Sequence, residues 1–78
     1  MTPELIEKLA ELEHEQWLSW ARAVWDEVSV ERREKWSPSM VPYAELSEGA
    51  KDQDREWARK AAEIAGSFFE TARMRDRM

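Results

Sequence analysis

The chain has 78 residues, of which 17 are acidic and 12 basic, so its net charge is −5. This length fits one domain, predicted to span residues 1–78, and the acidic balance argues against broad DNA binding, which requires a basic surface. The absence of cysteine excludes disulfides and thiolate metal sites, and no run of about 18 apolar residues is present to span a membrane.

The first predicted helix starts close to the N-terminus. Thr2 is the expected N-cap and Pro3 the first helical residue, because proline already has the helical φ. Apolar residues recur at helical spacing until Val28, and the expected inner face consists of Leu5, Leu9, Leu12, Trp17, Trp20, Val24 and Val28. The segment MTPELIEKLAELEHE is acidic and lacks the basic start and apolar centre of a signal peptide. We therefore predict that the protein is cytoplasmic.

A short helix and a loop follow. Ser29 can cap a charged helix from Val30 to Trp36. Pro38 and Pro42 push the residues before them into extended conformations. We therefore predict an ordered loop over residues 37–46.

The third predicted helix runs from its N-cap, Ser47, to about Arg75. Its expected inner face consists of Ala50, Trp57, Ala61, Ile64, Ala65, Phe68 and Ala72. Strand patterns are absent, so the predicted fold class is all-α: two long antiparallel helices with the short helix and the proline-containing loop between them. So thin a layer leaves little room to bury five tryptophans, which favours a homo-oligomer.

Several residues between about 10 and 60 resemble the ryanodine-receptor (RyR) domain family, of which small bacterial and phage proteins carry stand-alone copies. The residues that carry the resemblance are Glu13, His14 and Trp17, the loop Val41-Pro42-Tyr43, and Leu46, Lys51, Asp54 and Arg55 within LSEGAKDQDR. Between these halves, DEVSVERREKWSPS replaces the family's Gly-Trp-x-Tyr-Gly segment. The resemblance implies a mainly helical fold and recognition of a nucleotide or nucleotide-derived signal.

Lys51 and Arg55 are the first candidates for holding a ligand phosphate. They are four residues apart on one helix face, near a helix N-terminus whose free N–H groups and dipole favour an anion. Tyr43 or a tryptophan could then stack on a base. Alternatively, the two cations pair with Glu45, Glu48, Asp52 or Asp54, or the pair Asp54-Arg55 ties the loop to the first helix.

A second group of candidates lies on the first helix, where His14 and Trp17 share a face that Trp20 continues. The histidine could hydrogen-bond a ligand, with Asp54 orienting the site. Alternatively, it is a packed core residue bonded to a carboxylate or a carbonyl. Trp36 completes the stacking candidates, and Arg32 and Arg33 are additional anion contacts.

Catalysis is not predicted. The serines occupy caps and loops rather than a nucleophile elbow, and the paired carboxylates are typical of a solvated charged helix. Glu11 and His14 match the Glu-x-x-His spacing of di-iron bundles, but a single histidine would require a second chain, so no metal or cofactor is expected.

Two functions remain open. The first is non-enzymatic binding, or sequestration, of a small nucleotide-type ligand, with its phosphate at the start of the third helix. The second is a structural or interaction module that associates with a second copy or a protein partner through its aromatic helix faces.

Overall fold

The computed structural model describes residues 2–76, with side chains described for residues 2–69. Over this range the chain is helical and has no strand, which confirms the all-α class. The elements, in chain order, are α1 (Pro3–Ala23), η1 (Trp25–Glu27), α2 (Val30–Trp36), η2 (Ser37–Ser39), η3 (Tyr43–Glu45) and α3 (Glu48–Asp76), where η marks a short 3₁₀ turn. None of the described helices combines the length and the apolar character needed to cross a membrane.

The three predicted helix starts are confirmed by their caps. The Thr2 hydroxyl accepts a hydrogen bond from the backbone N–H of Leu5, and Ser29 accepts one from Arg32. Ser47 caps α3 in the same way. These bonds satisfy N–H groups that a helix start otherwise leaves without a partner. α1 ends at Ala23, earlier than the predicted Val28, because the chain continues into η1.

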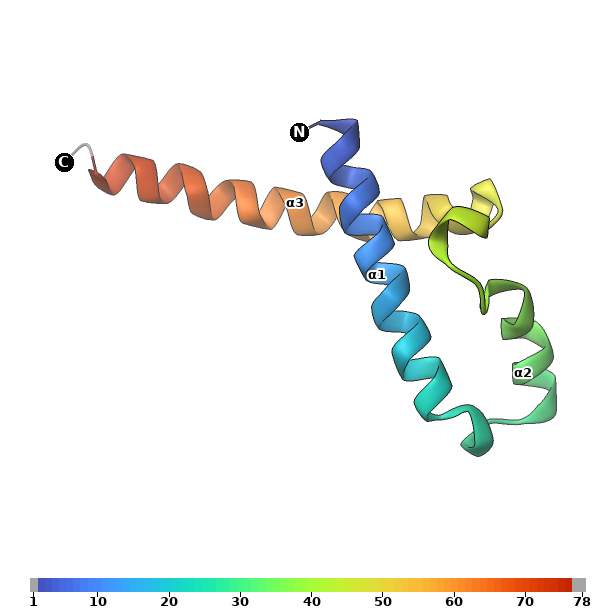
Figure 1. Ribbon diagram of the computed structural model, residues 1–78. Helices are drawn as coiled ribbons and strands as arrows, with labels where there is room; N and C mark the ends of the chain where they lie inside the picture. The colour runs from blue at the N-terminus through green and yellow to red at the C-terminus, as the bar shows by residue number, and fades with distance from the viewer. Residues whose placement is uncertain (1, 77–78) are drawn as a thin grey trace.

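The two long helices cross each other, and the second half of α3 extends away from α1 (Figure 1). The predicted antiparallel hairpin is therefore not confirmed. The small core lies near the crossing, where Ala10 of α1 and Ala58 of α3 are fully buried. Alanine on both helices allows a close approach, and Tyr43 and Leu46 of the connecting loop complete the core.

The predicted inner face of α3 is wrong beyond Ala50, which does pack on the core. Trp57, Ala61, Ile64, Ala65 and Phe68 are exposed. The helix instead turns Ala58 and Ala62 inward, one residue further along. The large side chains would hold the helices apart, whereas alanine permits their contact. The remaining predicted residue, Ala72, lies outside the residues whose side chains the structure describes.

A similar correction applies to α1. Leu5, Leu12 and Trp20 are exposed, whereas Leu9, Trp17, Val24 and Val28 are partly buried. The residues of α1 that are buried are Ala10, His14, Leu18 and Ala21. The apolar pattern therefore covers a wider part of each long helix than a single chain buries.

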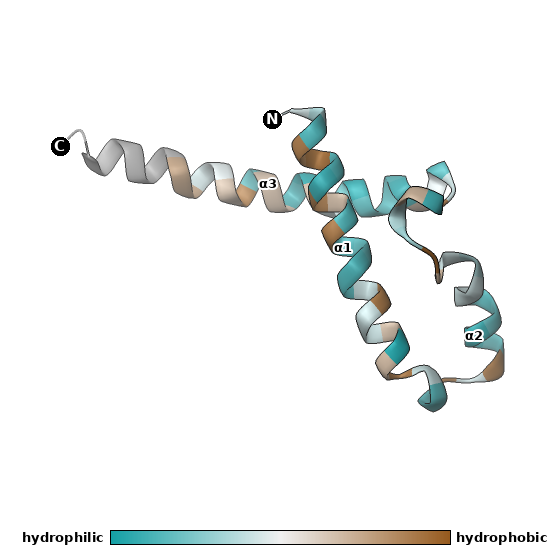
Figure 2. Ribbon diagram, in the orientation of Figure 1, coloured by the Kyte–Doolittle hydropathy of each residue, from teal (hydrophilic) through white to brown (hydrophobic). Residues whose placement is uncertain are grey.

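The molecule is elongated. Its radius of gyration is 16.4 Å, against about 11.5 Å for a compact domain of this length. Its accessible surface is 6411 Å² for a mass of 9.3 kDa, whereas a compact monomer of that mass has roughly 5,000 Å². Figure 2 shows hydrophobic residues along α3 beyond the crossing. The surplus surface therefore includes apolar surface on the part of α3 that α1 does not cover.

Candidate functional site

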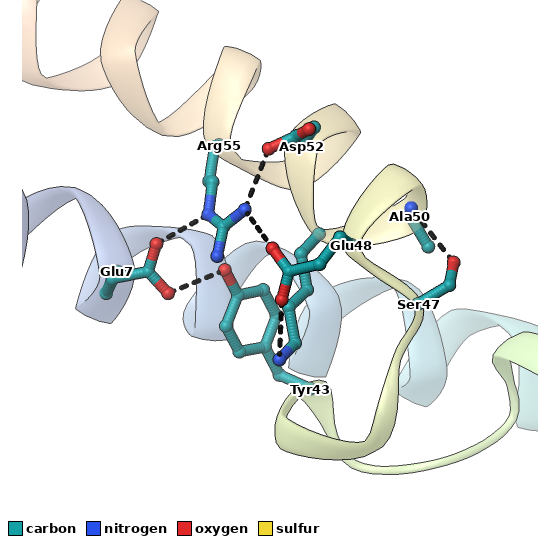
Figure 3. Close-up of polar contacts among 8 residues, drawn as sticks. Glu7, Tyr43, Ser47, Glu48, Ala50, Asp52 and Arg55 are labelled. Atoms are coloured by element: carbon teal, nitrogen blue, oxygen red, sulfur yellow. Dashed lines mark hydrogen bonds and ion pairs between the residues drawn. The ribbon is translucent and has the colours of Figure 1, made fainter.

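Arg55, in the second turn of α3, is surrounded by carboxylates (Figure 3). Its Nε donates to Glu7 of α1, and one terminal nitrogen donates to Glu48 at 3.0 Å and to Asp52 at 2.7 Å. The alternative in which Arg55 pairs with carboxylates of its own chain is thus the one observed. The contact with Glu7 joins α3 to α1. A link from the pair Asp54-Arg55 to the first helix was among the alternatives, but the sequence pattern did not identify Glu7 as the partner.

Tyr43 and Lys51 belong to the same network. The Tyr43 hydroxyl donates to the second oxygen of Glu7 at 2.9 Å. Lys51 lies 3.6 Å from a Glu48 oxygen, with its ammonium 5.6 Å from the centre of the Tyr43 ring. We call these six residues, Glu7, Tyr43, Glu48, Lys51, Asp52 and Arg55, the Arg55 network.

The charges of the Arg55 network hold one another in place. Hydrogen bonds from Arg55 keep the pKa values of Glu7 and Glu48 below their usual range. Burial, followed by the bond to Glu7, raises the pKa of Tyr43 to about 12. Three carboxylates thus surround two cations, and an incoming phosphate would have to displace carboxylates that are already bound.

His14 lies at a second junction, next to the Arg55 network. Its side chain is almost fully buried, and its Nε2 lies 2.6 Å from the carbonyl oxygen of Val41. Because a carbonyl only accepts, Nε2 is the donor. The other ring nitrogen, Nδ1, lies 3.6 Å from the Asp54 carboxylate, whose pKa is raised by burial. His14 therefore joins α1, the loop and α3, as the alternative of a packed core histidine predicts.

Aromatic rings extend from His14 along α1. The imidazole stacks on Trp17, with 5.8 Å between the ring centres. Trp36, at the end of α2, packs its ring against both Trp17 and Trp20, at 5.6 and 5.4 Å. These three tryptophans fix α2 against α1, so all three predicted stacking tryptophans already have aromatic partners on the helix opposite.

A small cleft of about 200 Å³ opens beside His14. It is lined by His14, Trp17, Ser39, Leu46, Ala50, Gln53 and Asp54, and we call it the His14 cleft. It brings together three predicted site residues from two helices. Ser39 and Gln53 were not predicted, because a lone serine in a loop and a glutamine in a charged helix have no distinctive pattern.

The remaining anion candidates lie elsewhere. Arg33 donates through Nε to the carbonyl oxygen of Trp25 at 2.6 Å, and its guanidinium lies 5.9 Å from the centre of that indole. Arg32 is exposed on α2. No contact between described residues links either arginine to Lys51 or Arg55. Within the described part of the chain, no three His, Asp or Glu side chains are grouped so as to hold a metal ion.

Searches against protein-family models, curated proteins and solved structures find no significant match to this chain.

Proposed function

We propose that this protein is a non-catalytic interaction module that docks a helix on the uncovered side of α3. The docking surface consists of Trp57, Ala61, Ile64, Ala65 and Phe68, and we call it the α3 apolar face. These residues follow one another at intervals of mostly three or four, the spacing of a helix-packing stripe. Trp57, Ile64 and Phe68 are 58%, 61% and 72% exposed.

The observation that carries this proposal is the surplus of exposed surface. The chain exposes roughly 1,400 Å² more than a compact monomer of its mass. A stable protein interface buries about 800 Å² on each partner. The surplus of the whole chain exceeds the area that one side of an interface needs. α3 also exposes large aromatic side chains, which are enriched in the centre of such interfaces.

The Arg55 network adds support. Lys51 and Arg55, the cations expected to hold a phosphate, already have carboxylate partners: Lys51 pairs with Glu48 within α3, and Arg55 also joins α3 to Glu7 of α1. This arrangement favours a structural role for the start of α3.

The test uses an apolar dye that becomes fluorescent on exposed hydrophobic surface, with two variants of equal charge. Ile64→Asp places a carboxylate in the α3 apolar face. Gly66→Asp is the matched control, because a side chain there meets open space and, at about 100° per residue, points away from the face. We expect strong dye binding by the wild type and the control in dilute solution, and much weaker binding by Ile64→Asp. Equal binding by all three would overturn the assignment of the surface.

The His14 cleft favours a second function, binding of a small nucleotide-type ligand. Trp17 offers an aromatic surface, and the Gln53 amide and the Asp54 carboxylate can bond the edge of a base. The resemblance to the RyR family supports the same reading. In this version the cleft receives the base, and the phosphate sits outside the Arg55 network. A cytoplasmic location, where nucleotide signals occur, belongs to this proposal.

Thermal unfolding against a panel of mono-, di- and cyclic nucleotides tests this second function. A ligand at a hundredfold excess over its Kd adds about 2.7 kcal/mol to the stability. For so small a domain this raises the Tm by more than about 5 °C. The shift should vanish in Gln53→Ala and persist in Gln16→Ala, an exposed glutamine of α1 outside the cleft. An unchanged Tm at millimolar concentration of every nucleotide would rule the ligand function out.

A further inference from the structure

We infer that the occupant of the α3 apolar face is a second copy of this chain, with the two α3 helices antiparallel and Trp57 of each opposite Phe68 of the other. This inference rests on the proposed docking function and names the partner. It follows from the order of side-chain sizes along α3 and from the position of α1.

The order of side-chain sizes fits antiparallel pairing. When Trp57 is placed opposite Phe68 of the second copy, Ala61 falls opposite Ile64, and the symmetry repeats both pairs. Two aromatic pairs then flank two pairs of a small and a large residue. Interdigitated packing requires such alternation. In a parallel pair each residue would meet itself, so two tryptophans would collide at one level and two alanines would leave a gap at the next.

The position of α1 leaves room for the second copy. By about 100° per residue, the α3 apolar face lies roughly a quarter turn from the side that holds Ala58 and Ala62 against α1. Phe69, which is 72% exposed, continues that second side beyond the crossing. In the antiparallel dimer the second copy's own α1 lies over the far half of this α3, on the side of Phe69. Four helices would then enclose side chains that one chain leaves exposed.

The first measurement is the mass of the full chain in solution by sedimentation equilibrium. We expect a dimer for the wild type and for Gly66→Asp, and a monomer for Ile64→Asp. A wild type that stays monomeric at all concentrations overturns the inference, while the dye experiment still decides separately whether the docking surface exists. A dimer that Ile64→Asp leaves intact also overturns the inference, because another surface then holds it.

A second measurement gives the direction of the helices. The chain has no cysteine, so Gln53→Cys provides a single site for a spin label. In the antiparallel register the two Gln53 positions lie about 28 Å apart along the helix axes, at 1.5 Å per residue. In a parallel pair they lie side by side, at the interaxial distance of about 8–10 Å. A distance distribution beyond about 25 Å supports the antiparallel register, and a short distance overturns it.

Discussion

At the scale of single residues, His14 shows how one side chain can determine the path of a loop. It contacts the carbonyl of Val41 with one ring nitrogen and faces Asp54 with the other. Few residue types could make both contacts, because the bond to the carbonyl needs a donor at the end of a side chain of suitable reach.

We expect His14→Ala to destabilise the fold by about 1–3 kcal/mol, since the partly buried Val41 carbonyl loses its donor. Urea unfolding followed by circular dichroism measures this free energy. Glu15→Ala, on the exposed side of the same helix, is the control and should stay close to the wild type. Equal stability of the two variants would contradict a structural role for His14.

The Arg55 network predicts a loss of stability in acid. The pKa values of Glu7 and Glu48 are lowered in the folded state, so their contribution is present above the unfolded pKa and is lost as the pH falls through the folded pKa. Asp54 acts in the opposite direction, because its pKa is raised and its charged form costs stability. Arg55→Ala should therefore lower the Tm at pH 7 and flatten the dependence of the Tm on pH below pH 5.

The matched control for this experiment is Glu56→Gln, which removes an exposed pair with Lys60. Such surface pairs contribute little. The Tm of this control should follow that of the wild type across the pH range. A pH profile for Arg55→Ala as steep as that of the wild type would show that the network does not cause the acid sensitivity.

At the scale of elements, the buried alanines Ala58 and Ala62 mark the side of α3 that α1 touches. Ala58 is fully buried at the crossing, whereas Ala61, three residues on, is exposed in the single chain. The sequence pattern favoured Ala61 because the large residues around it dominate the apolar pattern.

Substitution of the two alanines tests which side of α3 faces α1. Ala58→Leu should cost about 1–3 kcal/mol, because the crossing has no room for three further carbons. Ala61→Leu should leave the stability of the single chain almost unchanged when unfolding is measured in dilute solution. If Ala61→Leu destabilised the chain more than Ala58→Leu, the predicted inner face, and not the observed one, would pack on α1.

Gly66 lies in the interior of α3, where a Cβ would meet open space. Glycine in a helix interior costs about 0.5–1 kcal/mol relative to alanine. We therefore expect Gly66→Ala to raise the Tm and the helical circular dichroism signal. An unchanged or lower signal would show that this part of α3 does not unfold together with the rest of the domain.

At the scale of the whole molecule, a single chain buries only a small core of apolar side chains. The core at the crossing consists of two alanines, Ala10 and Ala58, with Tyr43 and Leu46, and the largest aromatic side chains described on α3 remain in solvent. Since a domain of this size has a small stability margin, association is an effective way to gain stability.

The antiparallel dimer predicts that the Tm depends on protein concentration, because the second copy binds the folded chain and not the unfolded one. Raising the concentration a hundredfold should raise the wild-type Tm by several degrees. Differential scanning calorimetry of the wild type and Ile64→Asp checks this, and the variant should show a constant Tm. A constant wild-type Tm would contradict association at these concentrations.

The sequence by itself determined the helices and their starts. Caps at Thr2, Ser29 and Ser47 are local, since each hydroxyl bonds an N–H three residues ahead, and the all-α class follows from spacing. Local interactions of this kind can be predicted from neighbouring residues.

Only the tertiary structure decided which side of each helix packs and which residues meet. The pairing of Arg55 with Glu7 and of His14 with Val41 joins residues 48 and 27 positions apart. Spacing along one helix carries no information on such contacts. The inward side of α3 was set by the helix crossing, where alanine allows two backbones to approach, and the largest apolar residues were left outside for that reason.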